Sequence, residues 1–169
     1  MGGRSGGAAT GRRGYPVGQG GATIPRLDTI DRSDLDFMVK PVKGGGKEHY
    51  GLVGEPREDE RGGKWIEVRG SAIDPAVQGQ GYGTGMYIAA MQESLRQGRG
   101  FRSDSRTLSP AAERVWKGLR ARLPAGAMER GRNPSGFPQY SITAEHLAAL
   151  GDNFNWASLE SGGRRRRSV

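Results

Sequence analysis

The sequence predicts a mixed α/β domain, in which short strands come first and a strand–turn–helix–strand unit follows. Apolar and polar residues alternate in segments before residue 74, as half-buried strands require. The apolar residues of segment 84–97 instead recur at helical spacing, and the Gly-rich segment 78–83 lies between the two patterns. The short neighbouring strands are expected to form adjacent hairpins.

Three strands are expected before the Gly-rich segment. The first covers 35–40, and the second covers 50–53, closed by Gly54 and a charged surface loop at 57–63. The clearest strand covers 65–73, and its alternation places Ile66, Val68 and Ala72 on one face and Trp65, Glu67, Arg69 and Ser71 on the other. Asp28 to Asp34 is expected to form one short turn.

Two longer helices are expected after the Gly-rich segment. The first covers 84–97, and Gly98 is a suitable stop. The second begins at Ser109 and Pro110, an N-cap residue followed by a proline that suits the first helical position, and ends at Pro124. The remaining elements are shorter: strands at 101–105 and 140–142, a loop at 130–138, and a helix at 144–150 that Thr143 caps.

Composition predicts one domain with basic ends. We expect a disordered Gly/Arg-rich arm at 1–23, a single domain at 24–157 and a basic tail at 158–169. The chain carries 26 basic and 18 acidic residues, a net charge of +8. Arg164, Arg165, Arg166 and Arg167 could therefore hold nucleic acid or a protein partner without reading a base sequence, although the same charge could serve solubility alone.

Several classes are excluded or disfavoured. Because the chain has no cysteine, it has no disulfide, thiolate metal site or cysteine nucleophile. His49 and His146 lack companions at ligand spacing, so no metal site is predicted. No apolar run approaches the roughly 20 residues of a membrane helix, and the start of the chain has no signal-like apolar region. We expect a cytoplasmic or phage-virion protein.

The segment Gln78-Gly79-Gln80-Gly81-Tyr82-Gly83 carries the clearest functional signal. Glycines between a strand and a helix let an anion approach the unpaired N–H groups of the first helical turn. The segment completes neither the dinucleotide fingerprint nor a Walker motif. It resembles the cofactor motif Gln/Arg-x-x-Gly-x-Gly/Ala of the GNAT N-acetyltransferase superfamily, over roughly residues 37–142. A looser likeness joins the stretch 101–116 to GNAT-like domains of large phage polyproteins.

The resemblance implies a fold, a cofactor and a site. The implied fold has a central, mostly antiparallel sheet flanked by helices. This sheet splays between the strand before the motif and the strand after the helix, and acetyl-CoA lies there. The cofactor would be held at Ala72, Ile73, Gln78, Gly79, Gly81, Gly83, Thr84 and Ser109. The acceptor would be an amine of unknown identity. Glu67 is the first candidate base, with Asp104 as a second, although a strand Glu paired with Arg69 and a turn Asp are the structural alternatives.

Two departures from the family leave the function open. Trp116 stands where the family has the Tyr that protonates the leaving thiolate, and an indole cannot act as that acid. Tyr140 or Tyr82 could replace it, or Trp116 could simply be a core residue. The two helices that usually precede the hairpin are also not evident. The alternative is a non-catalytic GNAT-like structural or binding protein, phage-associated, that contacts partners through its Arg-rich ends.

Overall fold

The computed structural model describes residues 27–31, 37–41, 51–72 and 81–160. The predicted arm at 1–23 and the arginines of the tail, Arg164 to Arg167, lie outside the described residues. The described part of the chain forms seven strands, three α-helices and one 3-10 helix. In chain order they are β1 (Leu27–Asp31), β2 (Phe37–Pro41), β3 (Gly51–Glu58), β4 (Lys64–Ala72), α2 (Tyr82–Arg96), β5 (Gly100–Arg102), α3 (Pro110–Arg122), β6 (Glu129–Arg132), β7 (Pro138–Ile142), α4 (Ala144–Ala149) and η2 (Trp156–Leu159).

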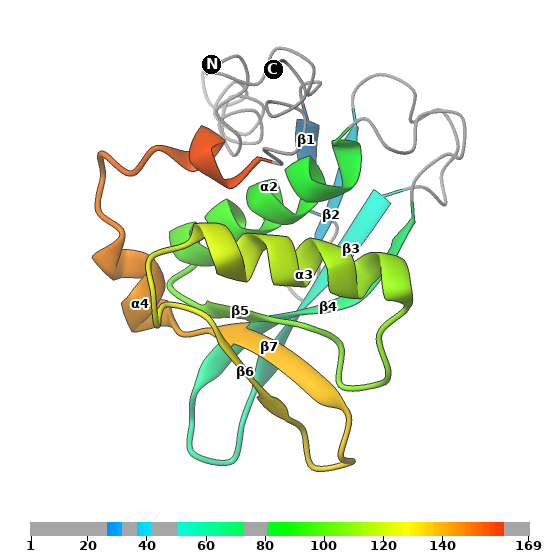
Figure 1. Cartoon of the computed structure of the whole chain (residues 1–169). Coiled ribbons are helices and arrows are strands. Elements are labelled where there is room, and N and C mark those ends of the chain that lie inside the picture. The colour runs from blue at the N-terminus through cyan, green and yellow to red at the C-terminus, as the bar shows by residue number, and fades with distance from the viewer. Residues whose placement is uncertain (1–26, 32–36, 42–50, 73–80, 161–169) are drawn as a thin grey trace, which may run out of the picture.

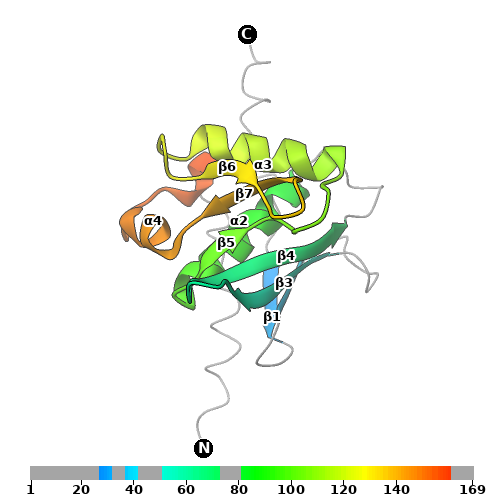
Figure 2. The same cartoon turned by 90° about the horizontal axis from the view of Figure 1, so that it is seen from below.

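The strands form one open, mostly antiparallel sheet in the order β1-β2-β3-β4-β5-β7-β6. Among the described strands, only β4 and β5 pair in parallel, and helix α2 connects them. Helices α2 and α3 lie on the same side of the sheet (Figures 1 and 2). The expected mixed α/β class with a mostly antiparallel sheet is therefore confirmed. No helix among the described ranges is both long and apolar enough to cross a membrane.

The core lies between the sheet and these helices. Helix α2 contributes an unbroken buried run from Met86 to Met91, and α3 contributes Trp116 and Leu119. The start of α3 follows the prediction, because Ser109 Oγ accepts a hydrogen bond from the Ala112 N–H and Pro110 is the first helical residue. Leu159, which the sequence placed in the basic tail, is fully buried and packs in this core.

Three boundaries were wrong because strand pairing across the sheet overrides local sequence. The turn expected at Asp28 is part of β1, which pairs antiparallel with β2. Strand β3 does not close at Gly54 but continues to Glu58 opposite β4. Most of β6 falls in the loop expected at 130–138. The backbone of β6 pairs with β7, but all four of its side chains are exposed, so the sequence shows no apolar alternation there.

A β-bulge changes the facing of the end of β4. The register with β3 shifts between Val53 and Gly54, so that Arg69 is an extra residue between two paired positions. Strict alternation predicted Ser71 on the face of Glu67. Instead, the Ser71 hydroxyl lies 2.9 Å from the Tyr87 hydroxyl of α2, on the helix side. The expected facing of Ser71 was therefore wrong, and the extra residue is the reason.

Candidate functional site

The sheet opens between β4 and β5. The two strands are paired over only three positions, Trp65 with Gly100, Ile66 with Phe101 and Glu67 with Arg102. Strand β4 then continues to Ala72, whereas β5 ends. Beyond Glu67, the edge of β4 that faces β5 therefore has no partner strand among the described residues.

The backbone directly after β5 bonds to β7 and not to β4. The Ser103 N–H donates to the Tyr140 carbonyl at 2.9 Å, and Ser103 Oγ accepts from the Tyr140 N–H at 3.0 Å. Asn133, which is buried, donates from Nδ2 to the Ser105 carbonyl and so ties the β6–β7 turn to the same segment. These bonds keep the backbone after β5 beside β7, so that it does not continue the pairing of β5 with β4.

Helix α2 is the next element after β4 among the described residues. Its N-cap, Gly81, has φ +92°, a conformation that favours glycine, and the first helical bond runs from the Gly85 N–H to the Gly81 carbonyl at 3.0 Å. No side chain caps this end, and its first turn has no acidic residue. The first backbone N–H groups, which include those of Gly83 and Thr84, therefore have no helical acceptor. An anion would be favoured here.

Three of the predicted cofactor-binding residues belong to the segment between β4 and α2. Ile73, Gln78 and Gly79 lie outside the described residues. Ala72 ends β4 beside the opening, and Ser109 is occupied as the N-cap of α3. At Gly83, the described atom nearest to an added Cβ would be Val115 Cγ2 of α3 at 4.0 Å, an ordinary contact distance.

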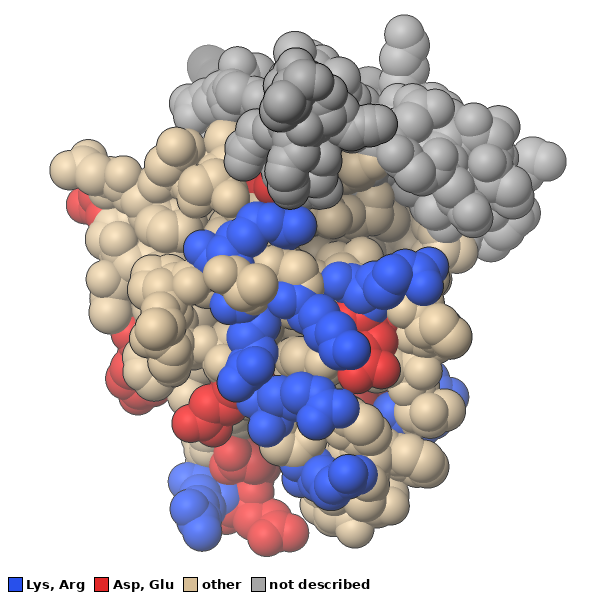
Figure 3. Space-filling model, in the orientation of Figure 1, with Lys and Arg blue, Asp and Glu red and all other residues tan. Residues whose placement is uncertain are grey.

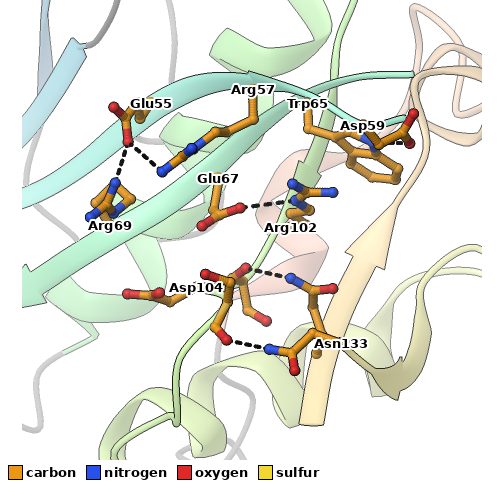
Figure 4. A network of polar contacts seen from close by, with 12 residues as sticks. Glu55, Arg57, Asp59, Trp65, Glu67, Arg69, Arg102, Asp104 and Asn133 are labelled. Carbon is orange, nitrogen blue, oxygen red and sulfur yellow. Dashed lines mark hydrogen bonds and ion pairs between the residues drawn. The ribbon is translucent and has the colours of Figure 1, made fainter. Parts of the chain in front are cut away.

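Glu67 lies at the start of the opening, on the sheet face away from α2 and α3. Its side chain is almost fully buried, and its Oε1 accepts from Arg102 Nε at 3.1 Å (Figure 4). The Arg102 guanidinium also lies over the Trp65 ring, 5.2 Å from its centroid. The alternative in which Glu67 is solvated and paired with Arg69 is wrong, because Arg69 Nη1 pairs with Glu55 Oε1 at 2.5 Å.

Asp104 lies in the same polar network as Glu67 (Figure 4). Its carboxylate accepts from the backbone N–H and the guanidinium of Arg106, both at 2.9 Å, so the turn role is confirmed. Burial alone would raise the pKa of Asp104, but the hydrogen bonds and charge of Arg106 outweigh it and hold the pKa below its ordinary value. Arg106 also donates to the Arg69 carbonyl of β4 at 3.4 Å.

Tyr87 is a site residue that the sequence did not reveal. It was predicted only as an apolar position of the helix, and it is 98% buried, with 2% of its surface exposed. Its hydroxyl nevertheless reaches Ser71, next to the last residue of β4. Burial raises the pKa of Tyr87, Ser71 offsets part of this, and the charge of Asp104 raises it further. Helical spacing places Tyr87 on the buried face of the helix but does not identify the partner of its hydroxyl, so no sequence signal would have found this contact.

Trp116 and Tyr140 belong to the helix side of the sheet. The Trp116 ring packs edge-on against Tyr87 at 5.3 Å and stacks on Tyr140 at 5.9 Å, and its buried Nε1 has no hydrogen-bond partner among the described residues. Trp116 is thus a core residue, as the sequence suggested.

The Tyr140 hydroxyl donates to Glu113 Oε2 at 3.2 Å and accepts from Arg130 Nε at 3.0 Å. Because Tyr140 and Phe101 face the helices while Glu67 and Arg102 face away, Tyr140 and Glu67 lie on opposite sides of the sheet. Of the three predicted catalytic residues, the structure therefore brings together Glu67 and Asp104 but not Tyr140.

The geometry offers an unpaired strand edge, an uncapped helix start, one buried carboxylate on the sheet face away from the helices, and one buried phenol whose hydroxyl reaches the end of β4 from the helix side. Among the described residues, no group of three or more His, Asp or Glu could hold a metal ion. A comparison of the sequence with models of known protein families found no match, and neither did a comparison with curated proteins.

Proposed function

We propose that this protein is an N-acetyltransferase that binds acetyl-CoA in the opening between β4 and β5. The observation that carries the proposal is the three-residue parallel pairing of these strands, followed by an edge of β4 beyond Glu67 that no described strand pairs with and that, among the described residues, only the Arg106 side chain contacts, at the Arg69 carbonyl. The resemblance of Gln78 to Gly83 to the GNAT cofactor motif supports the same location. The proposal includes a finer description of the fold, a GNAT-like sheet that would be splayed where the cofactor lies.

The residues present fit such a cofactor. The N–H groups at the start of α2, around Gly81, Gly83 and Thr84, would hold the pyrophosphate, because no side chain caps them. The backbone of Ala72 and Ile73 would pair with the pantetheine arm along the free edge of β4. Gln78 and Gly79 would complete the phosphate loop. Acetyl-CoA, when bound, supplies the acetyl thioester.

Two side chains would then move protons. The Glu67 carboxylate would accept a proton from the acceptor amine, directly or through a water molecule, and Arg102 would hold it in place. As the amine nitrogen bonds to the acetyl carbon and the carbon–sulfur bond breaks, the Tyr87 hydroxyl would donate a proton to the departing sulfur, in the role that Trp116 cannot fill; Tyr87 would then regain a proton from water, and Glu67 would release its own to water. The carboxylate of Asp104 is occupied by Arg106 and its pKa is lowered, so we assign it to positioning of the loop.

Calorimetric titration with acetyl-CoA tests the binding step. Gly83→Trp should abolish binding, because an indole on the first turn of α2 would crowd its uncapped N–H groups, while the added Cβ itself has room 4.0 Å from Val115 Cγ2. Gly131→Trp is the matched control, since Gly131 lies in exposed β6 with nothing within 4 Å of its Cβ position. Equal binding by both variants, or no binding by the folded wild type, would refute the proposed site.

A second candidate is a non-catalytic binding protein on the same fold. It is favoured by one observation, the fully buried Trp116 at the position of the expected acid. The two functions differ in whether a free thiol appears when acetyl-CoA and an amine are both supplied. Because the chain has no cysteine, a colorimetric thiol assay has no background from the protein. Acetyl-CoA binding without thiol release above the uncatalysed rate would favour the second candidate.

A further inference from the structure

A row of cations lies on the outer side of α3. Trp116 and Leu119 turn inward to the core, so Arg114, Lys117 and Arg120, spaced three apart, are exposed. Strand β6 adds Arg130 and Arg132, also exposed. Figure 3 shows lysine and arginine gathered over this part of the surface. These five residues are here termed the basic face: Arg114, Lys117, Arg120, Arg130 and Arg132.

The charge of the basic face is poorly neutralised. Helix α3 and β6 together hold six Lys or Arg and two Glu. Glu113 is partly engaged by the Tyr140 hydroxyl and Arg130. Arg114 and Lys117 have no ion pair or side-chain hydrogen bond with any residue that the structure describes. On the opposite sheet face, by contrast, the cations Arg69 and Arg102 are each paired with a glutamate.

The surface between α3 and β6 is also hollowed. A depression of about 670 Å³ has Leu123, Met128 and Tyr140 in its lining, together with the cations Lys117, Arg120 and Arg130. Two of these guanidinium groups are held in place: Arg120 Nε donates to the Met128 carbonyl at 3.1 Å, and Arg130 Nε donates to the Tyr140 hydroxyl. Fixed guanidinium groups lose less conformational entropy when they bind an anion.

We propose that the basic face binds the phosphodiester backbone of nucleic acid without reading its base sequence. A row of fixed and free cations over a shallow hollow matches an extended polyanion. An acidic protein partner fits less well, because protein interfaces depend on buried aromatic or aliphatic anchors. Phe137, in the turn beyond β6, is the one large hydrophobic residue exposed among the described residues. The inference does not rest on the proposed acetyl transfer.

Fluorescence anisotropy tests the proposal on the full chain with labelled 20-base-pair DNA of two unrelated sequences, and with the corresponding single strands. The variant Arg114→Gln/Lys117→Gln removes two charges and no side-chain bond that the structure shows. The control Arg61→Gln/Lys64→Gln removes two exposed charges, one from the β3–β4 turn and one from the first residue of β4. Both keep the terminal arginines. The first variant should flatten the slope of log K against log salt by up to about 1.8, roughly 0.9 per lost phosphate contact, and the control should leave it unchanged.

Equal losses in the two variants would overturn the proposal, because binding would then follow net charge or the chain ends. Absence of DNA binding by the wild type would also overturn it, as would tighter binding of labelled polyglutamate than of DNA, which would identify an acidic protein partner. Circular dichroism of each variant confirms that any loss is not due to unfolding.

Discussion

The two faces of the sheet around β4, β5 and β7 differ in chemistry, although they come from alternate residues of the same strands. Toward the helices, Ile66, Phe101 and Ile142 are fully buried with Trp116 and Tyr140. Away from them lies the Glu67–Arg102 pair, with the Glu55–Arg69 pair beside it. Apolar burial contributes most of the free energy of folding, whereas a buried ion pair contributes little net. One face thus determines the fold, and the other is available for chemistry.

The largest expected effect is a loss of stability when a cavity is made in the core between the sheet and the helices. Trp116→Ala should lower the free energy of unfolding by about 3–5 kcal/mol, because it leaves a cavity among three aromatic rings, those of Tyr87, Phe101 and Tyr140. Denaturation in urea measures it. A loss under about 1 kcal/mol would mean that Trp116 does not hold this face together.

A substitution on the opposite face should lower the acetyl-transfer rate more than the free energy of unfolding. Glu67→Gln should reduce acetyl transfer by about 100-fold or more, since the amide cannot accept the amine proton, while it can still accept a hydrogen bond from Arg102. Rates from the thiol assay, beside a urea denaturation curve, separate the two effects. The matched control is Glu55→Gln, a more exposed carboxylate in the neighbouring pair. Equal rates for both variants would remove Glu67 from the mechanism.

Tyr87 has its ring in the core on the helix face, and its hydroxyl reaches Ser71 near the end of β4. Tyr87→Phe should lower the acetyl-transfer rate by about 10-fold while acetyl-CoA affinity is kept, since the ring packing is preserved and only the proton is lost. Ser71→Ala removes the same hydrogen bond but leaves the phenol, and should cost less. If the two variants behave alike, Tyr87 positions the strand and donates no proton.

The smallest expected effect is the contribution of Asp104 to the free energy of unfolding, which should depend on pH. The lowered pKa of Asp104 means that folding favours its carboxylate form. Its contribution to stability is therefore complete above the unfolded pKa of about 3.9 and is lost as the pH falls through the lower folded pKa. Asp104→Asn should cost under about 1 kcal/mol near pH 7, because the pair is partly in solvent, and the difference from wild type should shrink below about pH 4. A difference that stays constant from pH 7 to pH 3 would contradict this assignment.

The sequence predicted elements that depend on local chemistry and missed those that depend on distant partners. Ser109 and Pro110 start α3 through contacts within four residues, and this was predictable. The partner of Glu67 was not, because Arg102 lies 35 residues away and reaches it only through parallel pairing. Likewise, β6 exists through its backbone pairing with β7, and the bulge at Arg69, invisible in the alternation, turned Ser71 toward Tyr87.

The central claim is that the gap between β4 and β5 is a cofactor site, and amide chemical shifts in a ¹⁵N-labelled sample titrated with acetyl-CoA test it most directly. We predict that the largest shifts fall on the free edge of β4, residues 68–72, and on the start of α2, residues 81–84. Shifts confined to the basic face would show only that phosphate groups meet exposed cations there. That result, or no shift in either region, would contradict the account.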